Sequence, residues 1–435
     1  MAAQQQGTPA EAVRRVLDGR AEGRRVEQIL ADLVELGPSS AEALFEVVLK
    51  EAADRTASRP SGLAAARGIA GQALRRLDRD VVRGVLARRA GSQPGALEAV
   101  LVLELYAELG RGNDLDVGLA IGAGLRDRAK AGRRGQAAAA SPASNPAPSP
   151  APSPAALAER GRRALAGWFE RDARAASLVH DRRAFLSESE RALVDEVFLA
   201  VDHPLALSIL SRRARAGRHP DDGLLVRLGE LGDRYPWRIG GEDLRLWEAL
   251  SFSPLWSERR AACMLVGAWR RPEAFEHLTE LAEDDPHPMV RQAAGAALSR
   301  IAGCERTLNA AGWRRWFEAR TAAWQRTAAV ALPELGGSDP SVVARAVAEL
   351  AGFRMHRHEL APAVAAVLEA HPQLAEQVAT ALYELDSRAC LPVLIELARE
   401  NDDPHLAEAL RRTLVHLGVR ASIEDPRWAQ VFSRY

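Results

Sequence analysis

The sequence is poor in lysine, cysteine and aromatic residues, and each shortage narrows the classes of protein that it can encode. Lys50 and Lys130 are the only lysines, so nearly every positive charge is an arginine, which we interpret as the coding bias of a GC-rich bacterial genome. The cysteines Cys263, Cys304 and Cys390 are far apart and form no CxxC pair. This spacing argues against a disulfide framework and a zinc ribbon, and we expect a reducing, cytoplasmic setting.

Net charge and long apolar runs are also missing. The 58 basic and 58 acidic residues balance, so no overall field attracts DNA or an anionic membrane, which disfavours nucleic acid as a partner. The most apolar run, residues 96–110, is interrupted by Glu98, Glu104 and Glu108. No stretch of about 18 uncharged apolar residues is present to span a bilayer. The N-terminal residues lack a basic segment followed by an apolar one, so we expect no secretion signal.

Strand signals are absent, and helical periodicity takes their place. Aromatics make up 5% of the chain, and no alternating apolar run is bounded by Asn-Gly or Asp-Gly. Apolar residues instead recur three and four positions apart, as at Val26, Ile29 and Leu33. Glycine and proline separate segments of about 12 to 17 residues, and Ser187 or Ser189 is expected to begin a helix. The predicted fold class is all-α.

The C-terminal half contains a repeated unit of helix, short turn and second helix. Copies begin at Pro272, Ala361 and Cys390, and a less regular copy contains Pro333, which we expect to kink or end its first helix. The regular copies have proline near the start, Asp-Pro or His-Pro in the turn, and a second helix rich in alanine and leucine. Because neither helix of such a pair can cover its own apolar stripe, the units must stack on one another.

This pattern resembles the HEAT-repeat family, in the short bacterial form of the phycobilisome-lyase-type repeats, over about residues 253–420. The strongest copy is DDPHPMVRQAAGAALSRIA, residues 284–302. The resemblance implies an α-solenoid. It also implies that the turn aspartate and the second-helix arginine link adjacent units. On this basis we assign a structural ladder of four residues: Asp285, Arg291, Asp339 and Arg345.

The domain organisation follows from a change of composition in the middle of the chain. Residues 135–157 lack charge and are dominated by proline, alanine and serine, which favours a semi-rigid spacer over a docking motif for a proline-reading domain. We predict an N-terminal helical domain over 1–133 and a disordered linker over 134–156. A helical segment over 157–251 then caps the HEAT-like repeats of 252–435. Extending the resemblance to 1–133, as degenerate repeats, is an extrapolation.

Catalytic and metal-binding patterns are thin. The sequence has no GxxxxGK[ST] or HExxH, and no GxGxxG or GxSxG in the required setting. His356, His358 and Glu359 are close in sequence, but positions two apart on a helix diverge by about 200°, so we interpret them as a polar turn. We expect no cofactor and no metal, and we predict that the protein is not an enzyme.

Residues 312–326 concentrate tryptophan and arginine. Trp313, Trp316 and Phe317 share one helix face, and Trp324 returns close to it. The favoured interpretation is an extra helix that packs its aromatics on the solenoid. The alternatives are an exposed surface that supplies hot spots for a protein partner, and arginine and aromatic side chains that stack on nucleobases.

The functional hypothesis is a scaffold or adaptor that binds a partner protein on the concave face, lined by the second helices. Its candidate partner-binding residues are Trp313, Arg314, Arg315, Trp316, Gln292, Arg300, Gln377 and Arg411. Two enzymes with HEAT-like folds remain as alternatives that the resemblance suggests. An alkylpurine DNA glycosylase would use Asp339 or Glu318 near Trp316 and Trp324. A bilin lyase would need an apoprotein and a pigment, of which the sequence gives no independent sign.

Overall fold

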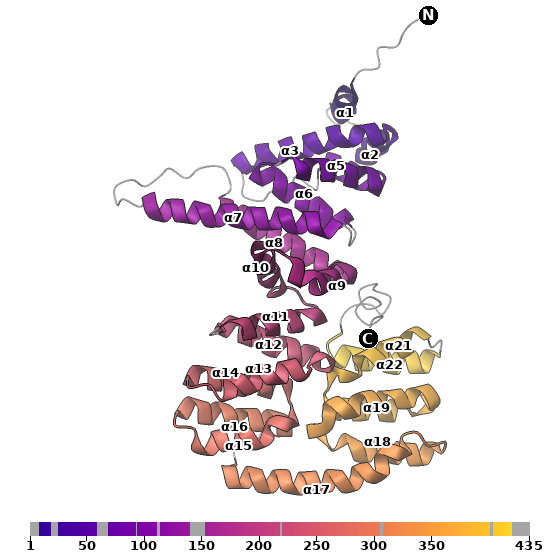
Figure 1. Cartoon of the computed structure of the whole chain (residues 1–435). Coiled ribbons are helices and arrows are strands. Elements are labelled where there is room, and N and C mark those ends of the chain that lie inside the picture. The colour runs from indigo at the N-terminus through magenta and orange to yellow at the C-terminus, as the bar shows by residue number, and fades with distance from the viewer. Residues whose placement is uncertain are drawn as a thin grey trace, which may run out of the picture. The chain divides into compact units, whose positions relative to one another are not determined.

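The computed structural model confirms the all-α class (Figure 1). The residues it describes form 22 α-helices with short 3₁₀ turns and contain no strand. None of the described helices combines the length and the apolarity that crossing a bilayer requires. The chain forms two compact units, unit 1 (Met1–Val201) and unit 2 (Asp202–Tyr435). The described residues are 8–18, 25–58, 68–92, 94–110, 114–139, 153–217, 220–304, 308–400 and 403–419.

Unit 1 is a set of packed helices around α6, whose side chains are buried almost all round. This helix packs against α5, α7 and α8. The helices of the unit are α1 (Pro9–Asp18), α2 (Val26–Glu35), α3 (Ala41–Ser58), α4 (Ile69–Arg76), α5 (Arg79–Gly91), α6 (Ala96–Leu109), α7 (Leu115–Ala139), α8 (Pro154–Arg171), α9 (Ala173–Arg182) and α10 (Glu188–Phe198). Ser187 caps α10 in a capping box with Glu190, as one of the two expected starts.

The boundary between the units differs from the predicted domain limits. Helices α7 and α8 lie on either side of the predicted linker, and they pack against each other and against α6. At Gly118 of α7, an added Cβ would lie 2.7 Å from Cζ3 of Trp168, so the missing side chain permits this close approach. Helix α7 runs to Ala139 and α8 begins at Pro154, which leaves residues 140–152 of the linker outside the described residues. The segment 157–251 is divided at Val201 between the two units.

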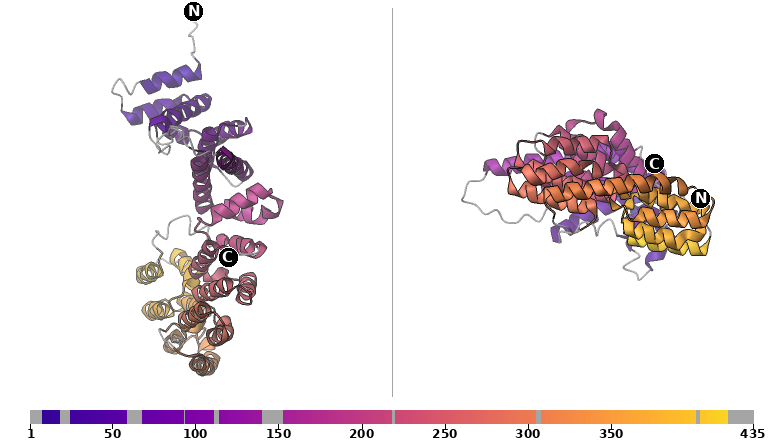
Figure 2. Two further views of the ribbon diagram at one scale, coloured as in Figure 1. Left: turned by 90° about the vertical axis from the view of Figure 1, so that its left-hand side faces the viewer. Right: turned by 90° about the horizontal axis from the view of Figure 1, so that it is seen from below.

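Unit 2 contains helix pairs in two stacks, which Figures 1 and 2 show from different sides. The first stack is α11 (Pro204–Ala216), α12 (Asp222–Arg234), α13 (Gly241–Ser251), α14 (Trp256–Trp269), α15 (Phe275–Asp284) and α16 (Pro288–Ala302). The second stack is α18 (Pro340–Ala351), α19 (Arg357–Ala370), α20 (Ala375–Leu385), α21 (Leu391–Glu400) and α22 (Pro404–His416). The long α17 (Ala310–Glu334) joins the stacks.

The second helices of the pairs pack on one another in rows. In the first stack α14 contacts both α12 and α16, and in the second stack α20 contacts both α18 and α22. Small side chains bring the helices together: a Cβ at Gly267 would lie 2.9 Å from Cα of Ala297. The predicted α-solenoid in the C-terminal half is therefore confirmed.

The row of second helices is interrupted at α17. This helix of 25 residues places Trp313 in the core of the first stack, while Ala331 lies in the core of the second stack. The second stack then runs back beside the first. The 3₁₀ turn η7 (Arg354–His356) contacts α16, and η9 (Arg388–Cys390) contacts η5 (Pro236–Arg238). The solenoid is thus folded into a hairpin of two stacks.

Candidate functional site

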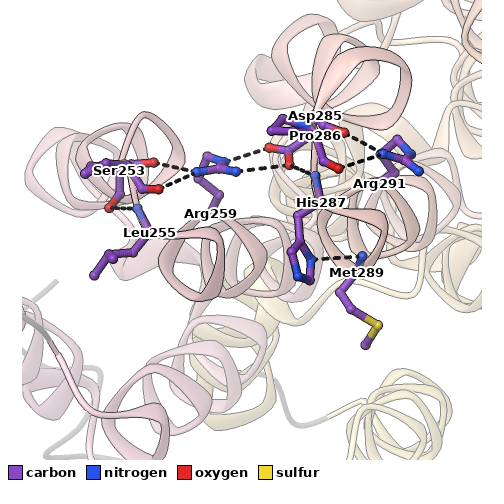
Figure 3. A network of polar contacts seen from close by, with 9 residues as sticks. Ser253, Leu255, Arg259, Asp285, Pro286, His287, Met289 and Arg291 are labelled. Atoms are coloured by element: carbon purple, nitrogen blue, oxygen red, sulfur yellow. Dashed lines mark hydrogen bonds and ion pairs between the residues drawn. The ribbon is translucent and has the colours of Figure 1, made fainter.

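The turn that begins the strongest repeat is tied to the preceding unit by an arginine. Nε and Nη2 of Arg259, on α14, donate to the two carboxylate oxygens of Asp285 at 2.6 and 3.1 Å (Figure 3). The carboxylate also accepts from the N–H of His287 at 2.9 Å. Nη1 of Arg259 donates to the carbonyls of Ser253 and Pro254. The guanidinium of Arg259 therefore binds both the turn that precedes α14 and the turn that precedes α16 in the next unit.

This bond network is buried and shifts the acidity of the carboxyl. The side chain of Asp285 is 2% exposed. Burial disfavours the charged form, but the hydrogen bonds from Arg259 and from the backbone of His287 outweigh it and hold the pKa of Asp285 below its usual range. The pair is ionised at neutral pH and acts as a strut between units.

Arg291 has a different role from the one expected. Its Nη1 donates to the carbonyls of Asp285 and Pro286 at 2.7 and 3.3 Å. Arg291 therefore binds the turn that precedes its helix α16, just as Arg259 binds the turn that precedes α14. The two arginines are both the fourth residue of their helices, which begin at Trp256 and Pro288. Sequence reasoning missed Arg259, although its matching place in the helix could have identified it.

The second Asp and Arg pair forms no such link between units within the described residues. Asp339 is exposed and caps α18, accepting from the N–H of Ser341 at 2.8 Å. Arg345 pairs with Glu334 at 3.2 Å. The two pairs differ because their second helices begin at different positions relative to the aspartate. Helix α18 begins directly after Asp339, which places Arg345 two positions further into its helix than Arg291, a rotation of about 200°.

The tryptophan and arginine segment packs against the solenoid. Trp313 is 1% exposed, and Phe317 stacks on Phe275 with 4.3 Å between ring centroids. Trp316 stacks on the same ring, and Trp324 stacks on His356 in the second stack. Of the candidate partner-binding residues here, Trp313 lies inside the core. Arg314 pairs with Glu283 at 2.7 Å, and Arg315 is exposed.

A groove of about 940 Å³ runs along the second helices of the first stack. Helices α12, α14 and α16 line it, together with Arg354, Arg357 and Asp386 of the second stack. Large apolar side chains are exposed on its surface: Val226 (52%), Trp256 (42%) and Met264 (43%). The indole of Trp256 stacks on the imidazole of His287 at 4.0 Å. The groove therefore offers an apolar surface in a concave place.

Five arginines and four carboxylates also line the groove. Arg270 pairs with Asp386 at 3.0 Å and lies 3.6 Å from Asp233. By contrast, no described residue forms an ion pair or side-chain hydrogen bond with Arg260 or Arg300. Arg300 is the one predicted concave-face residue that lines the groove. Gln292, Gln377 and Arg411 are exposed on α16, α20 and α22, outside its lining.

The two stacks meet beside the groove, where Arg270 and Asp386 of its lining form an ion pair. We call this contact the stack joint, formed by Trp269, Arg270, His358, Asp386 and Ser387. Nε2 of His358 lies 3.1 Å from the carbonyl oxygen of Trp269, and Nδ1 lies 2.8 Å from Oγ of Ser387. Burial, with a contribution from neighbouring Arg357, lowers the pKa of His358 to about 3. The imidazole is neutral at pH 7 and bridges the stacks by hydrogen bonds.

The residues considered for enzymatic roles are not gathered at the groove. Asp339 caps α18, Glu318 is exposed on α17, and Trp316 and Trp324 pack in different stacks. His356 lies 3.6 Å from Glu359, whereas His358 points to the stack joint. Within the described ranges, no group of three or more histidine, cysteine or acidic residues could hold a metal ion.

Stacked helix pairs with this packing define unit 2 as an α-solenoid. Residues 244–311, from α13 to α17, match the family model for HEAT repeats, which supports the resemblance seen in the sequence. The bacterial, phycobilisome-lyase-like form stays a prediction. No curated protein matches the sequence.

Two similar solved structures are crystal structures of Kap121p, one bound to Nup53p and one bound to Ste12p. The first has 13% identity and the second 12%, and each match has a TM-score of 0.35. Each covers 99% of this chain and 49% of the other. The chain thus spans about half the length of these similar chains.

Proposed function

We propose that this protein is a non-enzymatic scaffold that binds a segment of a partner protein in the groove along α12, α14 and α16. The observation that carries the proposal is the exposure of Val226, Trp256 and Met264 in one concave place. Exposed apolar side chains that gather in a groove mark interaction sites, whereas scattered ones need no explanation.

The polar lining supports the same function. Asp233 and Asp386 lie beside Arg270, so these ion pairs link the elements that line the groove. Arg260 and Arg300 offer guanidinium groups that no described residue engages, and arginine is common among the anchors of protein interfaces. An apolar surface with a few directed polar groups suits recognition of a protein segment.

Site-directed photocrosslinking tests this proposal. A photoreactive phenylalanine derivative would replace Val226 or Met264 in the full chain, and the covalent products formed in the producing cells would be identified. Val330 and Val415 are matched control positions, because they are 58% and 55% exposed and lie outside the groove. We expect one protein to crosslink from positions 226 and 264 and not from 330 or 415. Equal products from all four positions, or none, would contradict the proposal.

We also propose that the partner is met in a reducing cytoplasm. Cys263 and Cys390 are free and buried. Burial raises the pKa of each thiol to about 12, which suits two unreactive core residues. Thiol labelling of the native and the denatured chain from its own cells tests this, because both cysteines should label only after denaturation. Recovery of either one as a disulfide would contradict it.

A further inference from the structure

Most polar groups in the groove are charged, and few neutral ones are present that could pair with a peptide backbone. Its described lining contains no asparagine or glutamine. The only neutral hydroxyls are those of Ser257 and Ser299, and the hydroxyl of Ser299 already donates to the carbonyl of Gly295 at 3.2 Å. An extended segment lying there would find few neutral partners for its N–H and C=O groups, and each buried group left without a partner costs free energy. A helix pairs its own backbone groups, so it suits this lining.

Charge is distributed unevenly around the groove. Helix α12 supplies the acidic residues Asp222, Glu230 and Asp233. Glu230 pairs with Arg227 at 2.9 Å, and Asp233 lies beside Arg270. The other side is basic, with Arg260 from α14 and Arg300 from α16. A ligand therefore meets positive charge on the α14 and α16 side that no described residue pairs with.

We propose that the groove takes a short amphipathic helix of a partner protein, with an apolar stripe flanked by carboxylates. The stripe packs on Val226, Trp256 and Met264, and the carboxylates pair with Arg260 and Arg300. Ion pairs of this kind add hydrogen bonds to charge attraction. Helix α14 has 14 residues, a length of about 21 Å, so the ligand helix has about four turns. This inference rests on the proposed function and adds the chemistry of the partner.

Three synthetic peptides test the inference. Each has about 14 residues and the same leucine stripe at spacings of three and four, and the flanking positions carry glutamate, glutamine or lysine. Fluorescence anisotropy with the full chain at low salt gives the dissociation constants. Two partly exposed ion pairs predict about tenfold tighter binding of the glutamate peptide than of the lysine peptide. Added salt should reduce the difference.

A charge reversal provides the decisive comparison. In the variant with Arg260→Glu and Arg300→Glu the preference should reverse, so that the lysine peptide binds more tightly. The matched control carries Arg326→Glu and Arg399→Glu, which change two exposed arginines outside the groove, and it should keep the original preference. If the double variant does not fold, Arg300→Glu alone provides the test, because Arg300 is exposed and its replacement should leave the fold intact. This single variant should weaken the preference for the glutamate peptide.

The outcomes separate this inference from the proposed function. Equal affinities for the three peptides, or a preference that the charge reversal leaves unchanged, would overturn it. So would binding of none of the peptides. Concentration-dependent dimerisation that Arg300→Glu abolishes would also overturn it, in favour of a second copy of this chain. In each of these cases the crosslinks from positions 226 and 264 still decide whether the groove binds a protein.

Discussion

The two stacks of unit 2 share one pattern of helix pairs but present different surfaces. In the first stack the second helices expose Val226 and Met264, together with arginines that no described residue engages. In the second stack the exposed positions of α20 and α22 are mostly polar, with Val415 (55% exposed) as an exception, and several of them form ion pairs with one another. Arg412 forms an ion pair with Glu376, and Arg411 pairs with Glu408 at 2.7 Å. Under the proposed function, we therefore expect binding in the first stack.

This difference shows that repeat periodicity defines which helix faces are free, while side-chain chemistry decides which free face can bind. Gln377 and Arg411 are exposed on α20 and α22, and the neighbouring residues Glu376, Glu408 and Arg412 form ion pairs. A surface that satisfies its own charges gains little from a partner.

The first prediction concerns the two ends of α17. Trp313→Ala removes a fully buried side chain from the first stack and should lower the free energy of unfolding by about 4 kcal/mol. Trp324→Ala removes a half-buried side chain from the second stack and should cost about 2 kcal/mol. Urea denaturation followed by far-UV circular dichroism measures both. Equal losses would show that the two ends of α17 contribute alike.

The second prediction compares two aspartates with the same sequence spacing to an arginine. Asp285→Ala leaves the charge of Arg259 unpaired in a buried place and should cost about 3 kcal/mol. Asp339→Ala removes only an exposed helix cap and should cost clearly less free energy than Asp285→Ala. Because the pKa of Asp285 is lowered, its contribution is present above the unfolded pKa and is lost as pH falls through the folded pKa. Thermal unfolding from pH 7 down to pH 3 tests both statements. A larger loss for Asp339→Ala would contradict the assignment.

The third prediction concerns the stack joint. His358 has an unfolded pKa of 6.5 and a folded pKa of about 3, so below pH 6.5 the unfolded chain takes up a proton that the folded chain refuses. The free energy of unfolding should fall by up to about 1.4 kcal/mol per pH unit from this residue as pH decreases from 6.5 towards 3. His203, whose pKa burial lowers to about 4, adds a similar slope.

Replacement of the histidine checks this directly. In His358→Gln the slope between pH 6 and pH 4.5, measured by urea denaturation, should lose the part due to one proton. The variant should be less stable than the native chain at pH 7, because it disturbs the hydrogen bond to Trp269 of the first stack and the hydrogen bond to Ser387 within the second stack. An unchanged slope would mean that His358 is protonated in the folded chain.

The fourth prediction is the smallest in effect. Asp386→Asn removes the charge that pairs with Arg270 across the joint, at a position with φ of 46° that asparagine also tolerates. The pair is partly exposed, so the cost should be about 0.5 kcal/mol. A loss as large as that of Asp285→Ala, measured by urea denaturation, would mean that the joint depends on this ion pair more than on His358.

Much of the fold follows from local sequence signals. Helix periodicity and caps predicted the all-α class, and Ser187 was one of two expected starts for α10. Pro333 was expected to kink or end its helix, and α17 ends at the next residue. These features depend on a few neighbouring residues, which explains why the sequence alone reveals them.

The return of the second stack and the groove depend on contacts between distant residues. Arg259 and Asp285 are 26 positions apart, and His358 reaches a carbonyl 89 positions away. The spacing of Asp339 and Arg345 repeats that of Asp285 and Arg291. A two-residue difference in helix start gives the two arginines different directions, and periodicity alone does not show such an offset.

The length of α17 has a consequence for how the gene can vary. One continuous helix carries the cores of both stacks, and each inserted residue would turn everything after it by about 100° and move it by about 1.5 Å. Substitutions at the exposed positions between Phe317 and Ala323 should be tolerated, whereas a single codon inserted or deleted there would separate His358 from Trp269. This part of the gene should therefore tolerate substitutions but not insertions or deletions of single codons.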